Sequence, residues 1–281
     1  MATLLALLSS LLWGSADYFA GNLSKRLPAM VVLGINQAFG LIFGIALVVI
    51  TNGWSAPTLD SAGFFINGAL AGLAGYVGLL CLYAGLSTGR MGVVSPISSL
   101  SVLIPLFFAL AIKGDELATP VLMGVIAAVI GGFLASGPEV TQGLPIRPVL
   151  LALGAALGFG SSLTFMSIGS ADSSLLTMTT MRSTTFFISL AFFVKLGNFG
   201  GARKRDIPLI AGIGIADFSA NLLLGIATTK GLVSIAMVLG SLYPIATAVL
   251  AYIFLHERLH KVQYVGILLA VTGVALISAL Q

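Results

Sequence analysis

Charged residues are scarce in this sequence. Asp, Glu, Lys and Arg together make up 8% of its 281 residues, whereas a soluble domain carries about 25%. Hydrophobic residues make up 58%, and the mean hydropathy is +1.11. A chain with so few charges cannot solvate its surface in water. We therefore expect a multi-pass membrane protein, embedded in the lipid bilayer with only short loops outside it.

The residue types that enzymes and metal sites depend on are also rare. The single cysteine, Cys81, lies in an apolar run and excludes an internal disulfide. The two histidines, His256 and His260, share one loop, where a solvated turn is expected rather than a metal site. The sequence offers no nucleophile with a matching base and no phosphate-binding glycine loop with its lysine. We therefore predict a protein that is not an enzyme and has no cofactor and no metal.

Long apolar runs, bounded by glycine, proline or charge, fill most of the chain. One membrane-crossing helix needs about 20 mostly apolar residues. The runs predict ten such helices, at 3–23, 29–51, 62–87, 93–112, 118–137, 148–169, 174–194, 207–227, 232–254 and 261–280. An all-α membrane protein with ten transmembrane helices is therefore expected, and there is no room for a soluble catalytic domain.

The second half of the sequence repeats the first. At a spacing of 142 residues, Ser241 matches Ser99 and Glu257 matches Asp115, and glycines match glycines along the same ungapped register. A chance match between two glycine-rich apolar stretches is the alternative. The duplication predicts two five-helix repeats, 1–137 and 148–281, joined by a connecting loop at 138–147. Because five is an odd number, the two copies are expected to have inverted topology.

Basic residues fall mainly in the loops after the odd-numbered helices. Those loops hold ten Lys and Arg residues, and the loops after the even-numbered helices hold two, Lys113 and Lys230. By the positive-inside bias the odd loops are cytoplasmic and both termini lie outside. The net charge of +4 thus reports topology, and no nucleic acid partner is expected.

Three sequence features resemble one transporter family. An aromatic-Gly-Ser step opens each half, as Trp13-Gly14-Ser15 and Phe159-Gly160-Ser161, and the second half carries SLYPIATAVLAYIFLHERL before its last helix. With ten helices, this pattern resembles the EamA-type transporters of the drug/metabolite transporter superfamily. The first half departs from it, since Val102 stands where the register places Pro244.

The resemblance implies a transporter of small metabolites, often an exporter of amino acids or related compounds. It also implies that helices 1–4 and 6–9 enclose a central cavity and that helices 5 and 10 lie at the periphery. The family pattern favours an arginine in the second helix of each half. Arg182 fills this position in the second half, whereas Gln37 stands there in the first.

Three ionisable residues lie well inside the predicted helices: Asp17, Arg182 and Asp217. Such a residue costs at least about 2.5–3.5 kcal/mol in mid-membrane, so it needs a partner or a water-filled cavity. Arg182 and Asp217 differ in depth by roughly 5 Å, which predicts an ion pair. The pair either locks helices 7 and 8 together or exchanges with a substrate carboxylate or a proton. Asp17 lies about 10 Å deeper, as a cytoplasm-side gate or in a helix-end salt bridge near Lys25 and Arg26.

Other polar and aromatic residues complete the candidate site. A proline inside a membrane helix frees a carbonyl and permits a bend, and nearby serines satisfy the freed groups or line a polar path. The predicted substrate-binding residues are Trp13, Ser15, Gln37, Tyr76, Tyr83, Ser95, Ser99, Arg182, Asp217, Asn221, Ser241 and Tyr243. The predicted hinges are Pro96, Pro105 and Pro244. Helix packing and interfacial anchoring are the alternative roles for several of them.

Together with the resemblance, the sequence predicts a secondary transporter of the cell inner membrane that moves small polar metabolites by alternating access. The resemblance alone favours export, of amino acids or related compounds. Its expected partners are the substrate and the bilayer. Gly124 and Gly131, matched by Gly266 and Gly273, permit a homodimer through helices 5 and 10 as well as contact within one chain. The alternatives are a flippase for a lipid-linked intermediate and a non-transporting membrane accessory protein.

Overall fold

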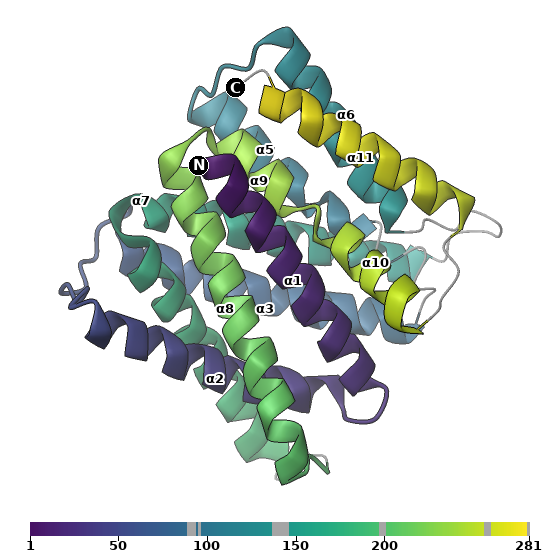
Figure 1. Cartoon of the computed structure of the whole chain (residues 1–281). Coiled ribbons are helices and arrows are strands. Elements are labelled where there is room, and N and C mark those ends of the chain that lie inside the picture. Colours follow the sequence, from purple (N-terminus) through teal and green to yellow (C-terminus); the bar gives the residue numbers. More distant parts are fainter. Residues whose placement is uncertain (89–93, 95–96, 137–145, 197–200, 256–259, 280–281) are drawn as a thin grey trace.

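The computed structural model describes the chain except for residues 89–93, 95–96, 137–145, 197–200, 256–259 and 280–281. In the described part the regular structure is entirely helical (Figure 1). The elements are α1 (Ala2–Ser24), α2 (Ala29–Ile50), α3 (Phe64–Thr88), η1 (Leu100–Val102), α5 (Leu103–Phe107), η2 (Phe108–Ile112), α6 (Thr119–Ala135), α7 (Ile146–Leu196), η3 (Lys204–Asp206), α8 (Ile207–Lys230), α9 (Val233–Gly240), α10 (Tyr243–Leu255) and α11 (Lys261–Ala279).

Seven helical segments of the described part are long and apolar enough to cross a membrane, and two shorter apolar stretches, Ile97–Ile112 and Thr119–Ala135, accompany them. One of the seven runs through most of α7, and as a straight helix its 49 residues would extend about 74 Å. The backbone of Ser173 is non-helical, with φ −153° and ψ 109°, and breaks α7 in two. The break falls between the helices predicted at 148–169 and 174–194.

The fourth apolar run of each half is interrupted rather than continuous. In the second half, the helix expected at 232–254 stops at Gly240 and resumes at Tyr243, so the break lies just before Pro244. In the first half, Pro105 lies in α5, between the 3-10 turn η1 and the π turn η2. In the 142-residue register Pro105 therefore lies about one turn after the position of Pro244, where the first half has Val102. Pro96 lies outside the described residues.

The centre of the molecule is α9, whose eight residues are all buried. A helix that is apolar on every side must be covered on every side, and α1, α8, α5 and α6 pack around it. By contrast, the outward faces of the other helices expose large apolar side chains such as Val49, Leu157 and Leu268. In a lipid bilayer these side chains meet acyl chains, so their exposure is compatible with a stable fold.

Two close helix contacts correspond to each other across the two halves. A Cβ atom added at Gly14 would lie 2.6 Å from the carbonyl oxygen of Tyr243, and one added at Gly160 would lie 2.5 Å from that of Ser101. Gly14 and Gly160 are 146 residues apart, and Ser101 and Tyr243 are 142 apart. Each first helix thus needs its glycine to touch the backbone of the interrupted helix in the other half.

Two loop contacts correspond in the same way. The guanidinium of Arg26 donates to both carboxylate oxygens of Asp206, at 2.5 and 3.1 Å. The carboxylate of Asp172 accepts a 3.0 Å hydrogen bond from the backbone N–H of Phe64. Arg26 lies just after α1 and Asp172 at the end of the first part of α7, whereas Phe64 is the first residue of α3 and Asp206 directly precedes α8. We call these two contacts the latches, because each joins one half of the chain to the other.

The helices α6 and α11 pack against each other at one edge of the molecule (Figure 1). A Cβ atom at Gly124 would lie 3.0 Å from the carbonyl oxygen of Gly273, and one at Gly131 would lie 2.7 Å from that of Gly266. The order of these contacts makes the two helices antiparallel. The glycine faces that permitted a homodimer are thus in use within the chain.

The carboxylate of Asp115 caps the N-terminus of α9. Its Oδ2 atom accepts 2.8 Å hydrogen bonds from the backbone N–H and the hydroxyl of Ser234. Replacing such a cap by alanine typically costs about 1 kcal/mol, so we expect Asp115→Ala to lower the thermal midpoint of the purified protein. Glu116→Ala is the matched control, because Glu116 is exposed; equal midpoints for the two variants would contradict the capping role.

Candidate functional site

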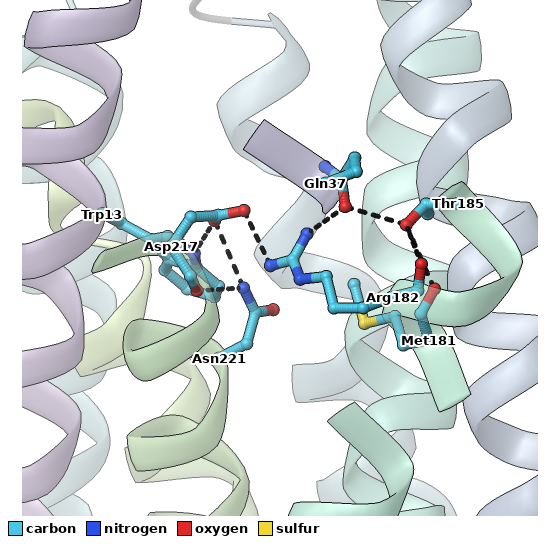
Figure 2. A network of polar contacts seen from close by, with 7 residues as sticks. All are labelled: Trp13, Gln37, Met181, Arg182, Thr185, Asp217 and Asn221. Atoms are coloured by element: carbon cyan, nitrogen blue, oxygen red, sulfur yellow. Dashed lines mark hydrogen bonds and ion pairs between the residues drawn. The ribbon is translucent and has the colours of Figure 1, made fainter. Parts of the chain in front are cut away.

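An ion pair lies inside the helix bundle and joins α7 to α8. The Nη2 atom of Arg182 is 2.7 Å from Oδ2 of Asp217 (Figure 2). This is the ion pair that the similar depths of the two residues in the membrane predicted. Arg182 is only 4% exposed, whereas the Asp217 side chain is 25% exposed. The arginine is therefore shielded, and the aspartate is the member of the pair that remains accessible.

The other side of the guanidinium is held by α2. Nη1 of Arg182 donates a 2.7 Å hydrogen bond to Oε1 of Gln37, and the same oxygen accepts a 2.8 Å bond from the hydroxyl of Thr185 (Figure 2). Gln37 is 3% exposed and Thr185 is 3% exposed. Since the two donors converge on one amide oxygen, the side chain of Gln37 is fixed in orientation.

Asp217 is in turn held by α1 and by its own helix. The indole Nε1 of Trp13 donates a 2.9 Å hydrogen bond to Oδ1 of Asp217. Asn221, one turn further along α8, donates to the same oxygen at 3.3 Å and to the carbonyl of Asp217 at 2.7 Å. Trp13 and Gln37 come from the first half of the chain, and Arg182 and Asp217 from the second. We call these residues, with Asn221 and Thr185, the polar network.

Hydrogen bonds within the polar network offset part of the cost of burying the ion pair. Removing two charges from water costs several kcal/mol per ion, and the attraction repays this only where further hydrogen bonds satisfy the ions. Here Gln37 supplies one such bond to Arg182, and Trp13 and Asn221 supply two to Asp217. The Nη2 atom of Arg182 has the ion pair with Asp217 but no hydrogen bond of suitable geometry, so any ligand that enters must compete with the ion pair and with these hydrogen bonds.

Asp17 lies one helical turn from Trp13 on α1, where residues four apart share a face. It is exposed and makes no ion pair or hydrogen bond with any described residue. Among the described residues, Asp17 therefore forms no helix-end salt bridge: Arg26 lies beyond the end of α1 and pairs with Asp206. Asp17 is thus an intramembrane acidic residue for which the described part of the chain supplies no counterion.

The remaining predicted residues are distributed around this centre and beyond it. The ring of Tyr243 packs edge-on against Trp13, with centroids 6.1 Å apart. Ser241 lies at the break between α9 and α10, where its hydroxyl donates to the carbonyl of Val238. Ser99 lies at the start of η1. The structure therefore places Tyr243 beside the network, with Ser241 two residues before it.

Two other predicted residues lie apart from the polar network. The hydroxyl of Ser15 donates to the carbonyl of Leu11 on its own helix. Tyr76 is 2% exposed, and its ring stacks on that of Phe192 at 6.1 Å. Both contacts are packing contacts of α1 and α3. Ser95 and the side chain of Tyr83 lie outside the described residues.

The sequence analysis did not select Thr185, which completes the hold on Gln37. A hydroxyl three residues after Arg182 shares its helix face, so this spacing was the available signal.

In the part of the chain that the structure describes, no group of three or more His, Cys, Asp or Glu residues is placed to hold a metal ion. The side chains of the polar network offer charge pairing and hydrogen bonding.

Comparison with known proteins shows which family and which solved structure this chain is similar to. The sequence profile described as "EamA-like transporter family" matches residues 1–137 and again residues 146–279. A solved structure described as "Crystal structure of protein" is similar in fold, with a TM-score of 0.79 and 15% sequence identity over 99% of this chain and 96% of the other. No curated protein matches the sequence. The two profile matches cover nearly the whole chain, which therefore belongs to the EamA-like transporter family of the drug/metabolite transporter superfamily.

Proposed function

We propose that this protein is a secondary transporter that moves a small polar metabolite across the cell inner membrane by alternating access. The observation that carries the proposal is the polar network, in which Trp13 and Gln37 of one half hold an ion pair of the other half. An intramembrane ion pair is expensive and marks a substrate path more often than a packing site. Asp217 is its accessible member.

The matched contacts of the two halves support alternating access. The antiparallel pairing of α6 and α11 is what two inverted repeats related by an axis in the membrane plane would make. The latches are exchanged by the same relation. In such a transporter, one latch opens as the other closes around a fixed central site. Each of the two parts of α7 counts as one membrane crossing, and so does each interrupted helix. Counted in this way, the chain has ten spans.

The family resemblance, and not the geometry, favours export and favours amino acids or related compounds as substrates. The inner membrane follows from the same resemblance. The loop charges place the ends of α1 and α7 and the start of α8 on the cytoplasmic side. On this assignment Asp17 lies on the cytoplasmic side of the polar network.

Counterflow in proteoliposomes tests the proposal. Vesicles preloaded with an unlabelled amino acid or other small metabolite are expected to accumulate its labelled form when they contain the wild-type protein and not when they contain heat-unfolded protein. Arg182→Lys retains the charge but loses the planar fork that bonds two partners at once, so we expect exchange to fall at least about tenfold. Absence of exchange for every compound, together with movement of a polyprenyl-linked lipid, would establish the flippase instead.

A further inference from the structure

The position of Asp17 on α1 directs its side chain into the molecule. Leu4, Leu8 and Leu11 are exposed and form the lipid-facing stripe of this helix. At 100° per residue, Asp17 lies about 220° around the helix from Leu4, on the opposite side. The exposure of Asp17 is thus not exposure to lipid.

The neighbours of Asp17 define where it points. Ala16 packs in a cluster with Ile210 and Ile213 of α8, whereas Gly14 touches the backbone of α10 at Tyr243. Asp17 lies between these two contact faces, toward the inside of the bundle. The side chain of Asp17 is exposed, as expected of a side chain that lines an interior surface open to water.

The accessible charge of the site is negative. Arg182 is 4% exposed and is already paired with Asp217. The accessible acidic side chains of the site are therefore Asp217, which has its counterion, and Asp17, which has none among the described residues. A ligand that approaches from the side of Asp17 meets both before it can reach the guanidinium. An anionic ligand is repelled on this path and a cationic one is attracted.

Two aromatic rings lie next to the same carboxylate. Trp13 precedes Asp17 by one helical turn, and the ring of Tyr243 packs edge-on against Trp13. The faces of tryptophan and tyrosine rings attract cations within about 6 Å. The indole N–H of Trp13 is fixed by its bond to Asp217, so the ring is held in place before a ligand arrives.

We infer that the substrate of this transporter carries a protonated amine, and that the Asp17 carboxylate binds this ammonium group beside the rings of Trp13 and Tyr243. The inference rests on the proposed transport function and narrows its substrate class. Arg182 then acts as the buried counterion that holds Asp217 in place, and it does not bind a substrate carboxylate. Amino acids and simple amines both belong to the class, whereas carboxylic acids without an amine do not.

Three probes that share one phenyl ring and side chain separate the charged groups: phenethylamine, phenylalanine and 3-phenylpropionate. Binding is measured by the fluorescence of Trp13 in detergent solution. The chain has two tryptophans, and Trp54, in the loop after α2, is 72% exposed. The variant Trp54→Phe therefore leaves Trp13 as the single reporter. This measurement does not require transport.

We expect both amine-bearing probes to change the Trp13 emission saturably and 3-phenylpropionate to leave it unchanged. Asp17→Asn, in the same background, removes a charge-assisted hydrogen bond and is expected to weaken amine binding about 10- to 100-fold. Asp60→Asn is the control, because it removes the same charge from an exposed loop residue. Since Asp17 has no partner among the described residues, Asp17→Asn should melt like the wild type.

Three results would overturn the inference: tighter binding of 3-phenylpropionate, unchanged amine binding in Asp17→Asn, or no saturable signal from either amine. The transport proposal stands or falls separately. Counterflow of a carboxylate without counterflow of an amine would keep the transporter and remove the amine site. Amine binding that depends on Asp17, without counterflow of any compound, would keep the site and remove the transport function.

Discussion

Arg182→Gln is expected to lower the free energy of unfolding by about 3–5 kcal/mol, the usual cost of removing one partner of a buried ion pair. The loss arises because Asp217 is left ionised inside the bundle without its counterion, and because Gln37 loses one of its two donors. Thermal unfolding followed by tryptophan fluorescence measures the change. Arg147→Gln is the matched control, since Arg147 is exposed at the start of α7.

The double variant Arg182→Gln with Asp217→Asn separates charge from shape. It removes both charges and keeps two amides of similar size, so we expect it to recover most of the stability lost by Arg182→Gln alone. A double variant that is less stable than both single variants would show that the two residues contribute independently. In that case the ion pair would not be what holds α7 to α8.

Gly214→Ala is expected to cost about 3 kcal/mol, at the upper end of the usual cost of overpacking. A Cβ atom at Gly214 of α8 would overlap the carbonyl oxygen of Asn36 in α2. This obstacle is a backbone atom and cannot rotate away, so α2 and α8 must separate. Because Asn36 precedes Gln37, we also expect the Gln37–Arg182 hydrogen bond to lengthen and substrate exchange to fall.

Gly212→Ala provides the control on the same helix. A Cβ atom at Gly212 would meet no atom within 4 Å, and alanine favours a helix more than glycine does, so this variant should not lower the thermal midpoint or the exchange rate. If Gly212→Ala and Gly214→Ala destabilise equally, neither helix propensity nor the contact with Asn36 would explain the loss. The close approach of α2 and α8 would then have no special part in the fold.

The sequence predicted most helix ends closely, because the thickness of the bilayer sets both the length of an apolar run and the length of the helix that it forms. The expected 3–23 and 207–227, for example, correspond to α1 and α8 at Ala2–Ser24 and Ile207–Lys230. The interruption at residues 241–242 was not predicted, because the apolar run continues through it. Hydropathy reports what surrounds a segment and not whether its backbone hydrogen bonds continue.

The Arg182–Asp217 pair could be predicted because each residue's depth can be counted from a helix end. The contact between Arg182 and Gln37 could not, although the register had shown that they are equivalent positions 145 residues apart. Equivalent residues touch only when they lie next to the axis that relates the two halves. Their distance from the proposed axis is a property of packing, and the sequence does not contain it.

The two latches differ in kind, and this difference bears on assay conditions. Arg26 and Asp206 are both ionised, and the Arg26 side chain is 44% exposed, whereas the bond between Asp172 and the Phe64 N–H has one neutral partner. Dissolved salt screens an exposed ion pair within a Debye length of roughly 8 Å at physiological ionic strength. It weakens a bond to a neutral donor less. In an alternating-access cycle, the ionic strength of the buffer would therefore shift the resting population toward one side of the membrane.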